Sequence, residues 1–190
     1  MTGSSKRLIV GISGASGIIY GIRALEIARR LNLETHLVMS KSAKLTATHE
    51  VSLKIKEIEE LASVVHRNEN VAASISSGSF ETIGMIVAPC SIRSLSEIAH
   101  GTTSSLLTRA ADVVLKERRR LVLLVRETPL HLGHLKSMVQ VTEAGAIVMP
   151  PVPAFYIRPQ TIDDIVDHTV GRALDLFGMR PPDLVRWSGA

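Results

Sequence analysis

Runs of apolar residues alternate along this chain with segments in which apolar positions recur every three or four residues. The runs predict buried strands, expected at 7–12, 34–39, 82–88, 121–125 and 146–149. The periodic segments predict helices, expected at 17–31, 41–51, 55–62, 91–99, 105–118, 131–144 and 161–177. This alternation predicts one α/β domain over residues 1–190, with a doubly wound parallel sheet and helices on both faces.

Three segments lack this periodicity. Residues 68–80 form a stretch rich in Ser with one Gly, and residues 150–160 contain four prolines beside Phe155 and Tyr156. Both patterns are typical of functional loops, but equally of ordinary connections. Residues 178–190 are expected to form a C-terminal tail that is either disordered or docked on a neighbouring copy.

The composition favours a buried parallel sheet. Hydrophobic residues make up 45% of the chain but aromatic residues only 3%, so the core is expected to be aliphatic. The mean hydropathy of +0.22 is explained by buried strands and subunit interfaces. No apolar run approaches the roughly 20 residues of a membrane helix, and no signal peptide precedes the first strand. A single cysteine, Cys90, indicates a reducing compartment, so we expect a cytoplasmic protein that does not bind membranes.

The charge distribution permits an anionic ligand without pointing to nucleic acid. Lys and Arg number 22 against 18 Asp and Glu, a net charge of +4. The densest basic run, 116–120, contains an acid and follows a helical pattern, which is typical of a solvated helix end. No aromatic residues that could stack on bases interleave with it. His131 and His134 have helical spacing but lack the glutamate and third ligand of a metal motif, so we expect no metal site.

The first predicted strand runs into a turn that contains Gly11, Gly14 and Gly17. Ser13 replaces the middle glycine of a dinucleotide fingerprint. The turn also lacks the Gly-Lys-Ser/Thr end of a P-loop and the G-x-S-x-G of a nucleophile elbow. What remains is a helix N-terminus with N–H groups beside Ser16, which can bind an anion. A tight structural turn without a ligand is the alternative.

Two more strand ends place polar residues at the same edge of the predicted sheet. The second strand ends before Ser40 and Lys41, where a dinucleotide site would need an acid, so these residues suit a phosphate monoester better than a ribose diol. The next buried strand is expected to stop at Pro89, and Cys90 and Ser91 then begin a helix. This strand and the first are expected to flank the switch point, so two helix N-termini would face one crevice. Cys90 is either a thiol of lowered pKa or, as we favour, a small residue buried at the strand end.

Charged residues in apolar surroundings are further candidates for ligand binding. Arg109 and Lys116 are seven residues apart on one predicted helix, so both can lie on one face and bind an anion, or extend to water. Arg126 and Glu127 follow a buried strand, at the edge where ligands bind. Arg126 could bind a phosphate or a carbonyl group, and Glu127 could transfer a proton or pair with Arg126.

Six stretches, taken in order, resemble one family, the UbiX-like flavin prenyltransferases. They span nearly the whole chain and read GISGASGIIYG, VMSKSAKLTATHE, SGSF, APCSIRSLSEIAHG, LLTRAADVVLKERRRLVLLVRETPL and PAFYIRPQTIDDIVDHTVGRALDLFG. The resemblance implies a Rossmann-like (flavodoxin-like) subunit of a homo-oligomer, expected as a dodecamer with active sites at subunit interfaces. It implies a transferase that joins the dimethylallyl group of dimethylallyl phosphate to N5 and then C6 of reduced FMN, without a metal. The product, prenylated FMN, would serve a UbiD-like decarboxylase.

The resemblance also assigns roles to residues at matching positions. It implies a flavin site, made by Gly14, Ala15, Ser16, Ser40, Ser91, Ile92, Arg93, Ser94 and Arg126. It implies a cationic pocket for dimethylallyl phosphate, made by Arg109, Lys116, Tyr156 and Arg172. It implies catalytic residues, namely Ser16, Glu50, Lys116 and Glu127, of which the glutamates serve proton transfer and ring closure. The chain departs from some members at Val71, where they have a tryptophan near the allyl group.

Two other functions are compatible with the same fold. FMN-dependent cysteine decarboxylases share it, but they have an Asn in the motif that corresponds to PCSIRSLSE and a later Pro-x-Met-Asn segment, which this chain lacks. A non-catalytic flavin carrier would leave the cationic pocket and Glu127 without a role. Dimethylallyl diphosphate stays open as an alternative prenyl donor.

Overall fold

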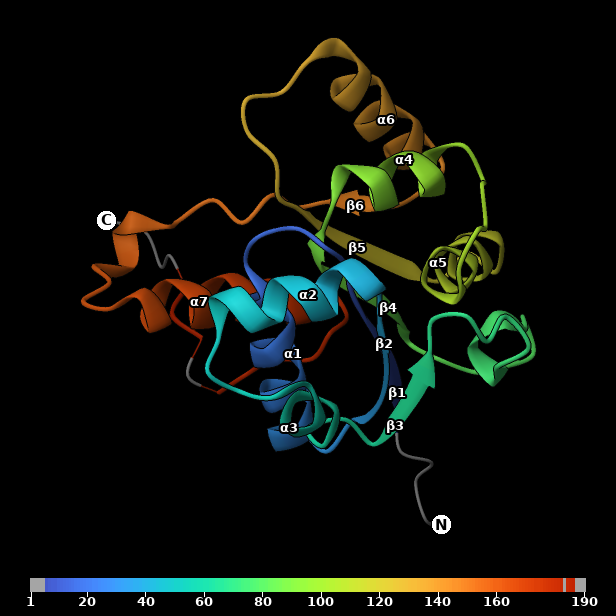
Figure 1. The fold of residues 1–190 in the computed structure, drawn as a ribbon. Coiled ribbons are helices and arrows are strands. Elements are labelled where there is room, and N and C mark those ends of the chain that lie inside the picture. The colour runs from blue at the N-terminus through green and yellow to red at the C-terminus, as the bar shows by residue number, and fades with distance from the viewer. Residues whose placement is uncertain (1–5, 183, 187–190) are drawn as a thin grey trace.

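The computed structural model describes residues 6–182 and 184–186, and in these residues six parallel strands form one sheet (Figure 1). In spatial order the strands are β3 (Val64–Arg67), β2 (Glu34–Met39), β1 (Arg7–Ile12), β4 (Gly84–Cys90), β5 (Arg120–Val125) and β6 (Ile147–Val148). The order reverses between β1 and β4, so the carboxyl ends of these two strands form the switch point at which such sheets bind ligands. The predicted α/β fold with a doubly wound parallel sheet is confirmed.

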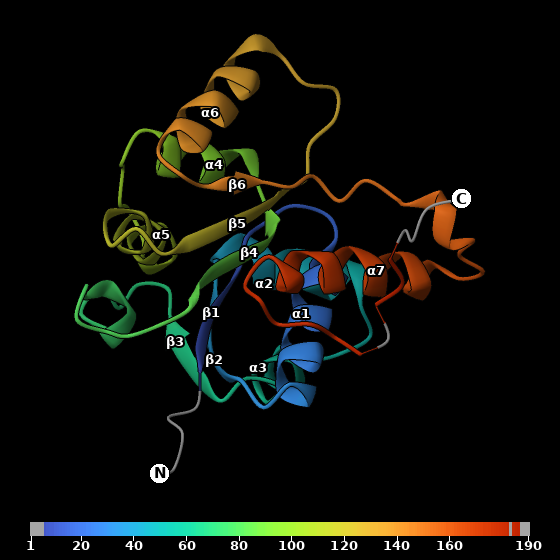
Figure 2. The same ribbon diagram turned by 180° about the vertical axis from the view of Figure 1, so that it is seen from behind.

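Helices cover both faces of the sheet (Figures 1 and 2). One layer contains α1 (Ile18–Arg30), α2 (Lys41–Glu50), α3 (Ile55–Glu59) and α7 (Ile162–Asp175). The other contains α4 (Ile92–Ala99), α5 (Leu106–Lys116) and α6 (Leu132–Glu143). Side chains of β1 alternate between the two layers, since Leu8 and Val10 belong to the first core and Ile9 to the second. Burial on both faces explains why the strands are continuous apolar runs in the sequence.

Every predicted strand and helix is present, and the largest difference at an end is in α3, which is predicted to reach residue 62 and ends at Glu59. The sequence misses β3. On this short edge strand Val64 and Val65 are 37% and 44% exposed, and polar residues follow at once, so no apolar run marks it. Contrary to expectation, β4 continues through Pro89, because its pairing with β5 shifts register there and a residue without an N–H is tolerated.

The two aperiodic loops each contain one short 3-10 turn, η1 (Ser74–Ser76) and η2 (Phe155–Ile157). The described part of the C-terminal tail folds back on α7, where the Val185 carbonyl lies 3.2 Å from His168 Nε2. These residues of the tail therefore pack against their own chain, docking on a neighbouring copy stays a prediction, and 183 and 187–190 lie outside the described residues. In the described part of the chain, no helix is long and apolar enough to cross a membrane.

Candidate functional site

Among the described residues, α2, α4 and α5 all begin at one polar cleft of about 290 Å³. Their N-cap residues are Ser40, Ser91 and Ser105, and each serine hydroxyl accepts a hydrogen bond from a backbone N–H in the first turn of its helix. The N–H groups that these bonds leave over at the starts of α2 and α4, together with the dipoles of the three helices, favour a bound anion. The cleft contains five residues of the predicted flavin site, namely Gly14, Ser40, Ser91, Arg93 and Ser94.

The sequence did not single out several other residues of the cleft. Ser42, Asn68, Ser105 and Thr108 line it as well. Asn68 lies on the loop after β3 and holds the start of α5, because its carbonyl and its Oδ1 accept the first N–H groups of that helix. The serine-to-threonine spacing before α5 is a capping pattern that could have identified this third helix start. Ile92, by contrast, packs its side chain against the core beneath α4.

Gly14 is required by a close approach between the glycine turn and α2. A Cβ at Gly14 would overlap the Ser42 Cβ, and it would lie 3.1 Å from the Ser42 carbonyl carbon. Gly17 adopts a left-handed conformation, with φ of 99°, that favours glycine. The glycines therefore bring the turn against the first turn of α2, which is one wall of the cleft.

Ser13 links the turn after β1 to the turn after β4. Its side chain is buried, and its hydroxyl donates to the Pro89 carbonyl at 2.9 Å while accepting from the Ser91 N–H at 2.7 Å. The sequence showed Ser13 only as a replacement for a fingerprint glycine. The structure shows that this hydroxyl holds together the two turns at the switch point.

The start of α1 was expected to offer free N–H groups to an anion, but two of these groups, those of Gly17 and Ile18, already have a partner within the chain. The Glu50 carboxylate accepts hydrogen bonds from the Gly17 N–H at 2.8 Å and the Ile18 N–H at 3.0 Å. Burial alone would raise the pKa of Glu50, but the hydrogen bonds from Ser16, Ile18 and Gly17, together with the charge of Arg126, outweigh burial and lower it. The structure thus brings Ser16, Glu50 and Arg126 together beside Gly14 of the cleft, and the N–H groups that can bind an anion are those at the starts of α2 and α4.

The effect of Glu50 on stability should depend on pH. Its pKa is lower in the folded chain than its ordinary value of 4.5, so its stabilising contribution is complete above pH 4.5 and is lost as the pH falls through the folded-state value. We expect Glu50→Gln to lower the urea midpoint at pH 7 and to differ less and less from the unchanged protein below pH 4.5. The exposed Glu69→Gln serves as control. A difference that does not shrink in acid would contradict this role.

Arg126 and Glu127 lie on the loop that follows β5. The backbone N–H of Arg126 donates to the Cys90 carbonyl at 3.0 Å, which fixes the loop at the end of β4. Burial raises the pKa of Tyr20, and the nearby charge of Arg126 opposes this shift. Glu127 is exposed, and its carboxylate accepts from the Thr128 N–H at 3.0 Å. Both residues therefore lie at the functional edge of the sheet, as predicted.

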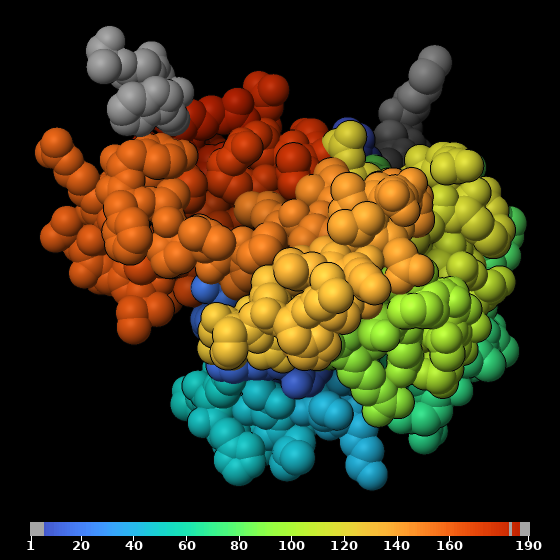
Figure 3. All heavy atoms as spheres, turned by 90° about the horizontal axis from the view of Figure 1, so that it is seen from above, coloured from blue at the N-terminus to red at the C-terminus, as the bar shows by residue number. Residues whose placement is uncertain are grey.

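The three cations and the one phenol of the predicted substrate pocket do not all meet within one chain. Arg109, in the first turn of α5, pairs with Asp112, and Lys116, at the other end of α5, pairs with Glu117. Tyr156 lies on η2, and Arg172 of α7 pairs with Asp175 at 2.6 Å. The segment with η2 lies at one end of the molecule and α5 at the other (Figures 1 and 3). The expected pocket is therefore not formed by a single copy.

Cys90 is not a reactive thiol. It is completely buried, and burial raises the pKa of the Cys90 thiol to about 12, which contradicts the possibility of a lowered value. The alternative that the sequence favoured, a small residue buried at the strand end, is the one observed.

We therefore expect Cys90 to resist modification in the folded protein. A maleimide at pH 7.5 should label less than about a tenth of the native chains within the time that labels the urea-unfolded chain completely, because only the thiolate of an accessible cysteine reacts readily. The unfolded sample is the control. Labelling of the native protein at the unfolded rate would contradict the observed burial.

Comparisons with known proteins show the family to which this chain belongs. The model of the family described as Flavoprotein matches residues 2–174. The flavin prenyltransferase UbiX of Escherichia coli strain K12 is 59% identical over 188 residues, which cover 97% of this chain and 100% of that protein. A crystal structure of AnUbiX (PadA1) in complex with FMN and dimethylallyl pyrophosphate is 50% identical, with a TM-score of 0.97 and coverage of 98% and 100%.

Two further solved structures show the difference between a relative in sequence and a protein that shares only the fold. A dodecameric FMN-dependent UbiX-like decarboxylase of Escherichia coli O157:H7 is 49% identical, with a TM-score of 0.94 over 96% of this chain and 100% of that one. The FMN-dependent cysteine decarboxylase TvaF, at 13% identity with a TM-score of 0.62 over 88% and 99%, shares the fold alone. Since the match to UbiX extends over nearly the whole of both chains, this chain belongs to the Flavoprotein family and, within it, to the UbiX flavin prenyltransferases.

Proposed function

We propose that this protein joins the dimethylallyl group of dimethylallyl phosphate to N5 and C6 of reduced FMN and releases inorganic phosphate. The family assignment makes it a transferase and a flavoprotein that uses FMN. The observation that carries the proposal is the cleft at the switch point, where three serine-capped helices begin beside the Ser16–Glu50–Arg126 group.

The residues of the cleft fit a flavin mononucleotide. A phosphate monoester suits the N–H groups at the starts of α2 and α4 and the hydroxyls that line the cleft, with Ser40, Ser91 and Ser94 as ligands. Gly14 and Ala15 let the backbone approach the flavin, because a side chain at Gly14 would fill the space next to Ser42. Arg126 lies at the same edge and is placed to bind a polar atom of the flavin ring. When bound and reduced, the flavin supplies a nucleophilic nitrogen, so the protein mainly has to align it with the allylic carbon.

The phosphate of the prenyl donor needs positive charge as it leaves. We assign this role to Arg109, Lys116 and Arg172, together with the Tyr156 hydroxyl. Because these side chains lie apart in one chain, the pocket is completed by neighbouring copies, as in a homo-oligomer. A dodecameric relative supports an oligomer, and a dodecamer is our proposal for this chain.

Glu50 and Glu127 are proposed to handle the protons that move when the second bond closes at C6. Glu50 is held ionised by its hydrogen bonds, and Glu127 is exposed on the adjacent loop. The prenylated flavin is proposed to serve a UbiD-like decarboxylase. A cytoplasmic location is part of the same proposal.

The test is anaerobic incubation of the assembled protein with reduced FMN and dimethylallyl phosphate, followed by mass spectrometry of the flavin. A flavin heavier by one C5H8 unit is expected, and phosphate should be released in equal amount. A parallel reaction with dimethylallyl diphosphate identifies the donor. Unchanged flavin with both donors would contradict the proposal and would favour a flavin carrier or a decarboxylase.

A further inference from the structure

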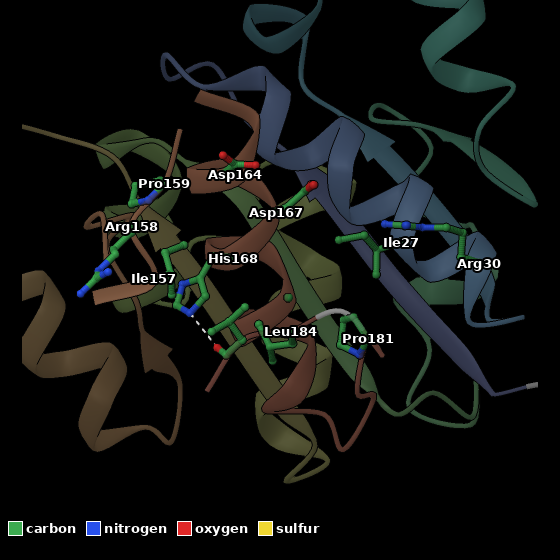
Figure 4. Close-up of a pocket in the computed structure, with 12 residues that line it drawn as sticks. Ile27, Arg30, Ile157, Arg158, Pro159, Asp164, Asp167, His168, Pro181 and Leu184 are labelled. Atoms are coloured by element: carbon green, nitrogen blue, oxygen red, sulfur yellow. Dashed lines mark hydrogen bonds between the residues drawn. The ribbon is translucent and has the colours of Figure 1, made fainter. Parts of the chain in front are cut away.

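A second cavity, of about 400 Å³, lies between α1, α7, η2 and the described part of the tail (Figure 4). His168 of α7 lines it and is only 9% exposed. The histidine contacts Tyr156, to which the proposed function gives a role, and Val185 of the tail, to which it gives none. The proposed function gives His168 itself no role.

The partners of His168 determine which atoms donate. Its Nε2 lies 3.2 Å from the Val185 carbonyl oxygen and 3.0 Å from the Tyr156 hydroxyl. A carbonyl oxygen can only accept, so Nε2 carries a hydrogen. The Tyr156 oxygen then accepts from the same N–H, and its own hydrogen is directed away from the imidazole. The two rings are nearly perpendicular, at 86°, with centroids 5.5 Å apart, so packing also fixes the phenol.

The charge of His168 agrees with this arrangement. Burial lowers the pKa of His168, the Val185 hydrogen bond opposes this shift, and the charge of Arg172 lowers the pKa further. The neutral ring with hydrogen on Nε2 therefore persists at neutral pH.

Arg172 lies one turn after His168 on α7, so the two side chains share a helix face. Arg172 is in turn held by Asp175, which also binds Arg186 and Arg180 of the C-terminal segment. The Asp175 side chain is 12% exposed, whereas its three arginine partners are 40% to 74% exposed, so the carboxylate is the shielded part of this cluster. The tail thus supports both proposed phosphate ligands, Tyr156 through His168 and Arg172 through Asp175.

We propose that His168 is a positioning residue for prenyl transfer, which orients the Tyr156 hydroxyl so that it donates to the phosphate of the donor. The tail carbonyl at Val185 sets the imidazole, and the imidazole sets the phenol. This inference rests on the proposed function, because Tyr156 matters only if the donor phosphate binds there.

The test compares two substitutions of His168, only one of which keeps an N–H hydrogen-bond donor. His168→Leu removes the N–H, whereas His168→Gln keeps an N–H donor near the place of Nε2. We expect the KM for dimethylallyl phosphate to rise about tenfold in His168→Leu and to stay within about threefold of the unchanged protein in His168→Gln. The Kd for FMN should be unchanged in both. If His168→Leu does not fold, His168→Met removes the donor at similar size.

A double-mutant cycle separates positioning from a general structural effect. In Tyr156→Phe, which has no hydroxyl to orient, His168→Leu should raise the KM no further. An unchanged KM in His168→Leu, or the same rise with and without the tyrosine hydroxyl, would overturn the inference. So would a His168→Gln protein with the KM of His168→Leu. If the unchanged protein leaves FMN unmodified, the proposed function fails, whereas an active protein insensitive to His168→Leu refutes only the positioning role.

Discussion

Lys116→Ala is expected to reduce prenyl transfer by about 10²–10³-fold while FMN still binds, because the ammonium stabilises the charge that develops on the leaving phosphate. Lys116 lies outside the polar cleft that we propose for the flavin, and its neighbour in the chain, Glu117, pairs with it. Turnover is measured anaerobically by the prenylated flavin formed, and FMN affinity by titration. The matched control is Lys56→Ala, an exposed lysine that also pairs with a glutamate. Normal turnover in Lys116→Ala would refute the assigned role.

The position of Lys116 on α5 indicates which copy of the chain it serves. Helix α5 has 11 residues and begins at the cleft proposed for the flavin, so Lys116 lies about 16 Å along the helix from that end. We therefore expect Lys116 to act in the site of a neighbouring copy. Oligomers assembled from inactive Lys116→Ala chains and inactive Gly14→Ala chains should regain part of the activity, because some sites then combine an intact cleft with an intact lysine. Mixed oligomers without any activity would show that the site is not shared.

Gly14→Ala is expected to weaken FMN binding by about 100-fold and to abolish turnover at ordinary FMN concentrations. The added Cβ would overlap Ser42, so the start of α2 must move away from the turn, and overpacking of this kind costs about 1–3 kcal/mol. Flavin fluorescence titration measures the affinity, and circular dichroism verifies that the fold is retained.

A compensating substitution tests the cause. In Gly14→Ala/Ser42→Gly the overlapping Cβ of residue 42 is gone, and the nearest remaining atoms are backbone atoms at 3.1 and 3.2 Å. We expect the double variant to recover most of the lost affinity, while Ser42→Gly alone has a small effect. Undiminished FMN binding in Gly14→Ala would mean that the flavin does not approach this turn.

Most of the fold follows from local patterns in the sequence. Parallel strands buried on both faces appear as apolar runs, and the amphipathic helices between them have a clear period. The edge strand β3 has no such apolar run, because Val64 and Val65 are partly exposed and pair with β2 on one side only. Its existence depends on the sheet beside it rather than on its own four residues.

The candidate site could be predicted where it depends on strand ends and helix starts. Ser40 and Ser91 follow strands directly, so topology alone brings them to the switch point. Side-chain contacts across the fold could not be predicted in this way. Glu50 comes from the end of α2 to occupy the start of α1, and Ser13 bridges two turns that are 76 residues apart. The cationic pocket was the least predictable part, because its residues lie apart in one chain and we propose that neighbouring copies complete it.

The most direct test is a structure of the assembled protein bound to FMN and dimethylallyl phosphate. We predict that the flavin phosphate lies at the starts of α2, α4 and α5, and that the donor phosphate contacts Lys116 and Arg172 from neighbouring copies. A flavin bound away from this cleft, or a donor phosphate that these cations do not contact, would contradict the account.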